Sequence, residues 1–285
     1  GCELAQMFAR VGVKVTIVCR SRLLSEGEPE ISAALTTYFR EEGITVTDGL
    51  SYKKIVQSKG HVSLIASGST GQFEIMAEKL LVTTGREANT AHLNLDDIGI
   101  ERSSNGGIKV DDHMRTNKAN IYAAGDVTGR DQFVYMAAYG AKLAAKNALN
   151  GDSLIYDASA MPAVTFSDPQ VASVGLTEAA ATKQGRSLKT SVLPLEHVPR
   201  ALAARDTRGL IKLVADAKTN KLIGAHIIAP EGADSLQTAA MAIKCGLTVD
   251  ELADTIFPYL TTVEGFKLAA QTFDKDVKKL SCCAG

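Results

Sequence analysis

Residues 13–18 form a short run rich in β-branched residues, and a stretch with helical spacing lies on each side of it. In residues 2–11 and in residues 28–42, apolar side chains recur every three or four positions, as on one face of a helix. A strand this apolar is typically buried on both faces. Strands of a parallel sheet are buried in this way, because helices cover both faces of the sheet. The order helix, strand, helix therefore predicts part of a doubly wound α/β domain.

The rest of the chain divides at the linker 150–153, whose sequence is Asn-Gly-Asp-Ser. Before it we expect a helix over 133–148 and short strands at 44–47, 61–66, 73–77, 80–83 and 121–126. After it the pattern is that of an antiparallel α+β domain. We expect its strands at 163–166, 171–175, 188–193, 210–215 and 222–228, and its helices at 177–185, 233–245, 248–254 and 262–274.

Composition excludes several classes of protein. The 285 residues suffice for two domains, and 45% of them are hydrophobic, as in well-packed α/β proteins. Lys and Arg number 31 against 32 for Asp and Glu, so charge gives no reason to expect nucleic acid or an anionic membrane as a partner. No apolar run reaches the roughly 20 residues of a membrane span.

The sequence begins at Gly1, directly at the start of a predicted helix, and shows no initiator Met or signal peptide. We therefore expect the C-terminal part of a longer protein, without the first strand of its dinucleotide-binding unit. Five cysteines, at positions 2, 19, 245, 282 and 283, lack the spacing of a disulfide framework. That usage favours a reducing compartment, the cytoplasm.

Three segments, taken together, resemble the pyridine nucleotide-disulphide oxidoreductases, the family of glutathione reductase and dihydrolipoamide dehydrogenase. They are Gly1-Cys2-Glu3, which is similar to the last glycine of a G-x-G-x-x-G turn; residues 84–90 followed by 121–126; and residues 163–178. The resemblance covers essentially the whole chain. It implies an α/β protein with a Rossmann-like NADPH-binding domain over 1–114, the C-terminal part of an FAD-binding domain over 115–150, and an α+β dimerisation domain over 151–285.

The resemblance assigns the nicotinamide dinucleotide to the first helix. Gly1 opens the helix whose N-terminal amides would bind the pyrophosphate, and Glu3 matches an acidic residue near the nicotinamide. A solvated first-turn Glu is the alternative for Glu3. Arg20 ends the second strand, where NAD enzymes carry a carboxylate, and Arg22 lies close by. Guanidinium groups suit a 2′-phosphate, so NADPH is expected rather than NADH, although surface arginines at strand ends are common.

The resemblance assigns FAD to the second half of the same region. Asp126 matches the aspartate that accepts a hydrogen bond from the ribityl chain, and the alternative is a turn Asp that caps the next helix. Val134 matches a position whose backbone faces the flavin. Gly85 matches a residue near the nicotinamide, and Arg86 matches one near the FAD pyrophosphate.

The segment 256–265 departs from the disulfide reductases of the family. Those enzymes carry a His-Pro…Glu motif whose histidine exchanges protons with substrate thiols. Phe257 falls at the histidine and Thr262 at the glutamate, and none of the five histidines lies in this segment. Phenylalanine cannot carry a proton. The departure argues against a dithiol or glutathione substrate.

The pair Cys282 and Cys283 lies two residues before the end of the chain, after a segment that holds Lys275, Lys278 and Lys279. This ending resembles the mercury-reducing branch of the family. Thiolates are soft ligands that favour a thiophilic ion such as Hg(II), and nearby lysines favour the thiolate form. Tyr259 matches an active-site tyrosine near the metal. Alone, a terminal Cys pair is more often incidental and a tyrosine more often packing, and we expect the other three cysteines to be buried, inert thiols.

The resemblance therefore implies reduction of Hg(II), delivered as thiol complexes, to elemental mercury by NADPH through FAD and cysteine thiolates. It also implies a homodimer in which one subunit's tail serves the flavin of the other. The alternative is a disulfide or dithiol oxidoreductase of the dihydrolipoamide dehydrogenase or glutathione reductase type, or, for this fragment, a non-catalytic nucleotide-binding and dimerising module. The family's inner Cys-x4-Cys pair is not in the chain, so the fragment alone is expected to be inactive.

Overall fold

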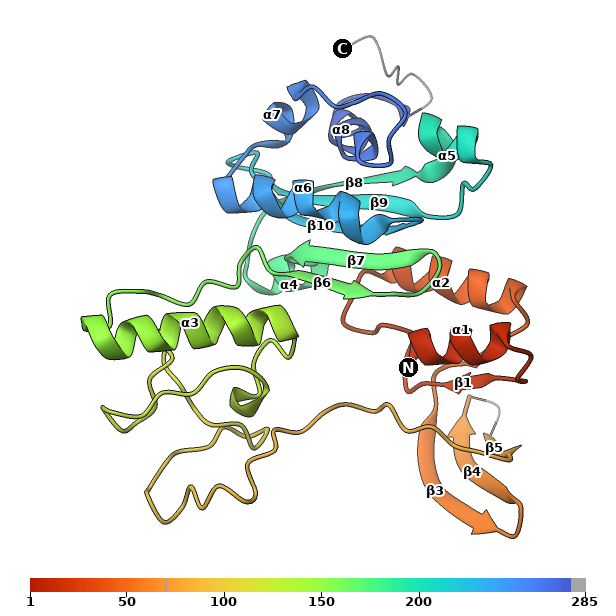
Figure 1. Ribbon diagram of the computed structural model, residues 1–285. Coiled ribbons are helices and arrows are strands. Elements are labelled where there is room, and N and C mark those ends of the chain that lie inside the picture. The colour runs from red at the N-terminus through yellow and green to blue at the C-terminus, as the bar shows by residue number, and fades with distance from the viewer. Residues whose placement is uncertain (70, 278–285) are drawn as a thin grey trace. The chain divides into compact units, whose positions relative to one another are not determined.

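The computed structural model describes residues 1–69 and 71–277 of this α/β protein (Figure 1). The chain forms two compact units. Residues 1–82 and the residues from 159 onward make the first, and residues 83–158 make the second. Each unit is described by itself below.

The first unit begins with the helix–strand–helix pattern that the sequence predicts. Helix α1 (Cys2–Arg10), strand β1 (Thr16–Val18), helix α2 (Pro29–Glu41) and strand β2 (Thr45–Thr47) follow one another. The two strands pair in parallel, with Thr16 opposite Thr45 and Val18 opposite Thr47. On α2 the predicted apolar face is buried, and Leu35 and Phe39 are fully enclosed. The strand at 13–18 is shorter than predicted, because only its second half pairs with a neighbour.

A three-stranded antiparallel sheet follows, made of β3 (Ser51–Ser58), β4 (His61–Gly68) and β5 (Gly71–Ala77). The sequence predicts β4 and β5 but not β3. Nearly every β3 side chain is exposed, so its sequence carries no alternation of apolar and polar residues. The predicted strand at 80–83 is wrong. Leu80, Leu81 and Val82 are exposed, and no described residue pairs with them in a ladder.

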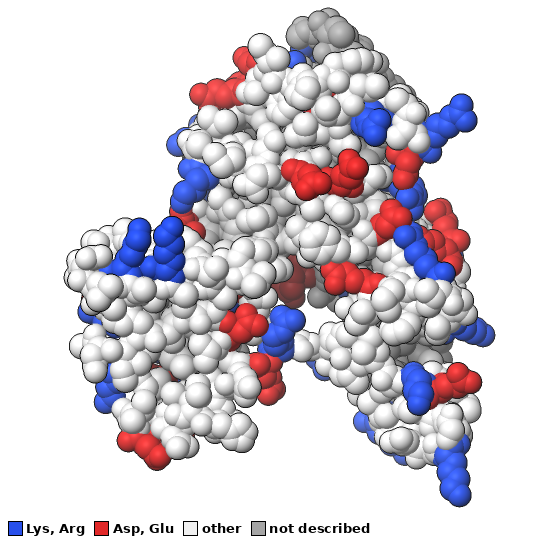
Figure 2. All heavy atoms as spheres, in the orientation of Figure 1, with Lys and Arg blue, Asp and Glu red and all other residues white. Residues whose placement is uncertain are grey.

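The second unit contains a single turn of 3-10 helix, η1 (Asp126–Thr128), and the long helix α3 (Val134–Asn150). The predicted helix is confirmed, and the turn that ends the segment 121–126 is present as η1. The strand predicted before this turn is wrong, since among the described residues an isolated bridge between Arg115 and Tyr122 stands in its place. Helix α3 buries Met136, Leu143 and Ala144 and leaves basic residues outside. Figure 2 shows blue side chains gathered over this helix.

The rest of the first unit is a five-stranded antiparallel sheet in the order β6-β7-β10-β9-β8. Its strands are β6 (Pro162–Thr165), β7 (Gln170–Gly175), β8 (Leu188–Pro194), β9 (Leu210–Asp216) and β10 (Leu222–Ala229). Its helices are α4 (Glu178–Lys183), α5 (Pro199–Ala204), α6 (Gly232–Cys245), α7 (Val249–Asp254) and α8 (Glu264–Gln271), and η2 (Leu195–His197) is one 3-10 turn. All five strands and every helix except α5 match predicted segments.

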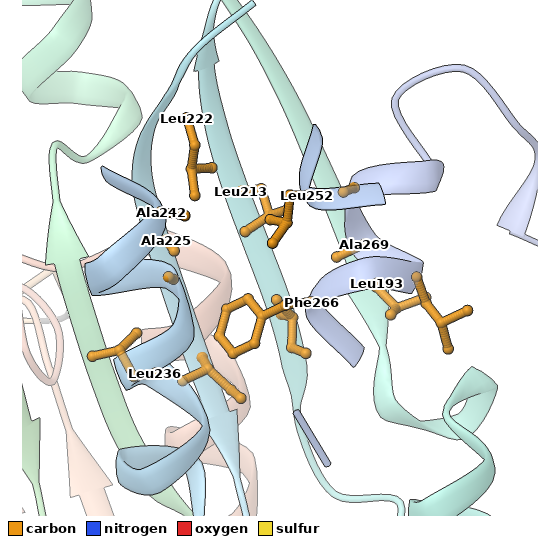
Figure 3. Packing of buried hydrophobic residues seen from close by; sticks show 14 of the residues in the cluster. Leu193, Leu213, Leu222, Ala225, Leu236, Ala242, Leu252, Phe266 and Ala269 are labelled. Atoms are coloured by element: carbon orange, nitrogen blue, oxygen red, sulfur yellow. The ribbon is translucent and has the colours of Figure 1, made fainter. Parts of the chain in front are cut away.

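One face of this sheet carries the main core. Alternate residues of β9 and β10, among them Leu213 and Ile227, pack with Leu236 of α6, Leu252 of α7 and Phe266 of α8. Figure 3 shows Leu236, Leu252 and Phe266 directed from the helices toward the two strands. Full burial of each large apolar side chain contributes about 1.5–3 kcal/mol. The helices therefore fix the sheet firmly from this side.

The opposite face of the sheet is covered by α2. Ile228 of β10 belongs to the same cluster as the buried side chains of α2, and Val171 and Leu210 pack against that cluster. Strands β9 and β10 are consequently buried on both faces. Every polar side chain that points toward α2 from these strands must find a partner there.

Candidate functional site

The N-terminus of α1 is the expected pyrophosphate site. Gly1 is the N-cap residue and makes no side-chain hydrogen bond to the first turn, so the helix presents uncapped amides. These amides and the helix dipole suit a phosphate group. The Glu3 carboxylate accepts a hydrogen bond of 2.7 Å from the amide of Phe166. Glu3 is therefore fixed in place rather than freely solvated.

The end of β1 carries the two arginines expected at the 2′-phosphate, and they differ in their surroundings. Arg20 is exposed, and its guanidinium carbon lies 5.7 Å from the ring centre of Tyr52. Arg22 is half-buried and donates a hydrogen bond of 2.6 Å to the carbonyl oxygen of Gly27. Its Nε atom is buried and has no hydrogen-bond partner among the described residues. Arg20 thus presents an exposed guanidinium beside the Tyr52 ring, whereas Arg22 is hydrogen-bonded to the loop that follows.

In the second unit, Gly125 and Asp126 open η1. Gly125 has a φ of +79°, and a Cβ at this position would lie 2.9 Å from the Cβ of Ala137 in α3. The position therefore requires glycine. Asp126 is exposed and does not cap α3, whose N-cap residue is Phe133. The alternative role of Asp126, a turn residue that caps the next helix, is therefore wrong.

The other expected flavin residues lie in the same unit. Val134 is the first residue of α3, and its side chain is 84% exposed. Gly85 has a φ of +127°, which only glycine adopts readily, and both Gly85 and Arg86 are exposed. An exposed carboxylate beside a glycine of positive φ, and an exposed helix start, are groups that suit the ribityl chain and ring edge of a flavin. Residues 83–158 therefore hold groups suited to FAD.

The loop 255–263 connects α7 and α8 and contains the position of the missing histidine. Phe257 is half-buried against the main core and lines a pocket of about 360 Å³ together with Met241, Cys245 and Leu252. Tyr259, two residues further on, is 62% exposed. At the position where the resemblance expects a histidine, the chain therefore has an apolar ring that packs against the core.

Cys282 and Cys283, the expected metal ligands, lie outside the described residues. Among residues 1–69 and 71–277, no cluster of three or more metal-ligating side chains occurs. Cys2 is buried and Cys19 half-buried, and burial raises the pKa of both thiols, as expected of inert cysteines. The same expectation for Cys245 is wrong. It is exposed, because it lies one turn after Met241 on the outer face of α6.

Sequence reasoning missed a buried ionic cluster between the α2 face and the sheet. Lys212 of β9 is 1% exposed, and its Nζ lies 2.8 Å from Glu28, 2.9 Å from Glu30 and 2.8 Å from Glu178. These carboxylates keep the pKa of Lys212 well above its usual range despite burial. His226, opposite Lys212 on β10, has its Nε2 3.7 Å from Glu28. The sequence feature that could have indicated this cluster is Lys212 itself, a lysine inside an otherwise apolar strand.

The chain is similar to known proteins along nearly its whole length. Residues 1–145 match the pyridine nucleotide-disulphide oxidoreductase family, and residues 161–270 match the dimerisation domain of that family. The chain belongs to the pyridine nucleotide-disulphide oxidoreductases. As expected of this family, a nucleotide-binding region is followed by a dimerisation domain. No helix in the described part of the chain has the length and apolar character that a membrane crossing requires.

Several curated members of the family are similar to the whole chain. The mercuric reductase of Bacillus cereus is 49% identical over 100% of this chain and 45% of the relative. That of Acidithiobacillus ferrooxidans is 50% identical over 99% of the chain and 51% of the relative. That of Streptomyces lividans is 48% identical over 100% of the chain and 60% of the relative. The chain thus spans between 45% and 60% of the length of these three relatives.

Solved structures of the family have the same fold. The Cu(II) complex of the HOCl-induced flavoprotein disulfide reductase RclA from Escherichia coli matches with a TM-score of 0.83 and 28% identity, over 95% of this chain and 61% of that one. LpdA from Mycobacterium tuberculosis matches with a TM-score of 0.84 and 25% identity, over 96% and 59%. The α/β prediction is therefore confirmed.

Proposed function

We propose that the full-length protein reduces Hg(II) to elemental mercury with NADPH, and so detoxifies mercury. The observation that carries the proposal is Phe257, an apolar residue where the disulfide-reducing members of the family carry a proton-transferring histidine. The mercuric reductases of three bacteria, 48–50% identical over nearly the whole chain, support it. In the overall reaction NADPH and Hg(II) give NADP⁺, Hg(0) and one proton.

The residues of the first unit bind the reductant. The N-terminal amides of α1, beginning after Gly1, hold the pyrophosphate, and Arg20 holds the 2′-phosphate with its guanidinium N–H groups. Glu3 lies in the same first turn and orients the nicotinamide side of the site. NADPH is accordingly preferred over NADH.

The residues of the second unit hold the flavin. Asp126 would accept a hydrogen bond from a ribityl hydroxyl, the backbone at Val134 would lie near the ring, and Arg86 would pair with the pyrophosphate. FAD, when bound, supplies the two-electron exchange between the nicotinamide and the cysteine sulfurs. Gly85 matches a residue near the nicotinamide in the family.

Cys282 and Cys283 bind the metal substrate. Hg(II) reaches them as a thiol complex and passes between sulfurs by ligand exchange, so the ion is never free. The phenol of Tyr259, exposed on its loop, provides a weak further contact. The dimerisation domain brings two subunits together, and the tail of one serves the flavin of the other. The cytoplasm, where thiols stay reduced, is the compartment that suits this chemistry.

The test follows NADPH absorbance in the full-length protein with Hg(II) and excess thiol. Three proteins are compared: the wild type, the double variant Cys282→Ala/Cys283→Ala, and Cys245→Ala as a matched control from the exposed end of α6. We expect mercury-dependent oxidation in the wild type and in Cys245→Ala, and strongly reduced oxidation in the double variant.

Two other results would change the proposal. Mercury-dependent oxidation that the double variant retains in full would keep the reaction and remove the tail from it. Oxidation that depends on a disulfide and not on Hg(II) would make the protein a disulfide reductase, the activity named for the structurally similar RclA.

A further inference from the structure

We propose that Tyr52 is a positioning residue for NADPH recognition, because its ring holds the Arg20 guanidinium in place for the 2′-phosphate. This inference rests on the proposed role of Arg20. Tyr52 lies 32 positions further along the chain, at the start of β3, and none of the resemblances in the sequence points to it. Its assignment comes from three features of the structure: the fixed backbone around Arg20, the fixed ring, and the contact between the ring and the guanidinium.

The backbone on both sides of Arg20 is held by the segment that leads into β3. The Cys19 amide donates to the carbonyl oxygen of Thr47 (3.0 Å), and the Leu50 amide donates to that of Cys19 (3.2 Å). The Gly49 amide donates to the carbonyl oxygen of Ser21 (3.2 Å). Gly49 has a φ of +68°, a conformation that glycine adopts without strain. The Cα of Arg20 is therefore fixed, and only its side chain needs further positioning.

The ring of Tyr52 is itself fixed. Its hydroxyl donates a hydrogen bond of 3.1 Å to the carbonyl oxygen of Val18, so the ring spans from β3 to the end of β1. The ring packs against the small core formed by Leu50, Leu64 and Ala66. A register shift between Tyr52 and Lys54 on β3 sets this first part of the strand apart from the rest.

The contact between the two side chains leaves the phosphate-binding groups of Arg20 available. The guanidinium carbon lies 5.7 Å from the ring centre, within the range of a cation–π contact. Such a contact uses the ring face. Among the described residues no hydrogen bond or ion pair engages the N–H donors of the exposed Arg20 side chain, so they can pair with phosphate oxygens. An arginine held in this way loses less side-chain freedom on binding, which raises affinity.

The experiment measures equilibrium binding of 2′,5′-ADP and of 5′-AMP to the full-length protein, since the two probes differ in the 2′-phosphate. Tyr52→Leu should weaken 2′,5′-ADP binding by about two- to fivefold. It should leave 5′-AMP binding unchanged. Tyr52→Phe keeps the ring and should bind 2′,5′-ADP nearly as the wild type does. Phe73→Leu, which removes a ring from the same small core, is the matched packing control and should change neither affinity.

Arg20→Leu separates this inference from the proposed function. If Arg20→Leu leaves 2′,5′-ADP binding unchanged, the phosphate assignment itself is wrong. If Arg20→Leu weakens it and Tyr52→Leu does not, only the role of Tyr52 is wrong. Equal losses in Tyr52→Leu and Phe73→Leu would also overturn that role, since packing alone would explain them. In the Arg20→Leu background, Tyr52→Leu should have no further effect.

Discussion

The Nζ atom of Lys212 lies 2.8 Å from Oε2 of Glu28, although 184 positions separate the two residues in the chain. Both side chains are 2% exposed. The ion pair joins the dimerisation-domain sheet to the start of α2 in the nucleotide-binding region. Two further carboxylates, Glu30 and Glu178, share the same ammonium group and reach solvent on their outer sides. One buried cation thus connects elements from three parts of the sequence.

Removal of that cation should destabilise the full-length protein. Lys212→Met leaves Glu28 buried without its partner, and we expect the free energy of unfolding to fall by about 3 kcal/mol, the lower end for such losses because Glu30 and Glu178 are partly hydrated. Urea unfolding followed by circular dichroism measures it. Lys189→Met on the neighbouring strand β8 is the control and should change the free energy by less than about 0.5 kcal/mol. Equal effects of the two variants would contradict the role of the cluster.

His226 should make stability depend on pH. Burial lowers the pKa of His226 below its ordinary value of 6.5, while Glu28, Glu30 and Lys212 face it. Below about pH 6.5 the imidazole of His226 is protonated in the unfolded chain but stays neutral in the folded protein. The free energy of unfolding therefore has its full value above about pH 6.5 and falls as the pH drops below it. The slope from this one group reaches at most about 1.4 kcal/mol per pH unit.

Urea midpoints of the full-length protein between about pH 7.5 and 5.5 test this dependence. His226→Gln should flatten the profile in that interval, and His92→Gln, a variant of an exposed histidine, should not. An unchanged profile in His226→Gln would mean that other groups cause the loss of stability.

Arg20 should decide the choice of nicotinamide cofactor. Arg20→Glu in the full-length protein removes a charge-assisted contact and adds a repulsive carboxylate. We expect KM for NADPH to rise by about tenfold or more and KM for NADH to change little. Steady-state kinetics with both cofactors measure this. If Arg22→Gln shifts the preference while Arg20→Glu does not, Arg22 is the phosphate ligand and its bond to Gly27 is secondary.

Tyr259 should affect the reaction without affecting the fold. Its side chain is largely exposed, so Tyr259→Phe should change the free energy of unfolding by less than about 0.5 kcal/mol. Loss of one polar contact to the metal should slow mercury-dependent NADPH oxidation by about fivefold. An unchanged rate would show that the Tyr259 hydroxyl makes no contact with the metal that matters for the reaction.

Most of the fold was predictable because its signals are local. The helical spacing around Leu35 and Phe39 and the apolar runs at 210–215 and 222–228 each lie within a few residues, and burial in the structure follows them. The departure at Phe257 is local in the same way, since a single side chain decides whether a proton can be carried. The adjacent Cys282 and Cys283 are known from the sequence alone.

Tertiary structure decided what depends on distant partners. The run at 80–83 has the residues of a strand but no neighbour in the described chain, and a strand exists only where a second backbone accepts its hydrogen bonds. Lys212 sits in an apolar strand because three carboxylates from other elements meet it. The same holds for Tyr52, whose ring has a role only because β3 returns to the end of β1. A sequence pattern specifies which face of an element is apolar, but packing chooses the partner for each polar group.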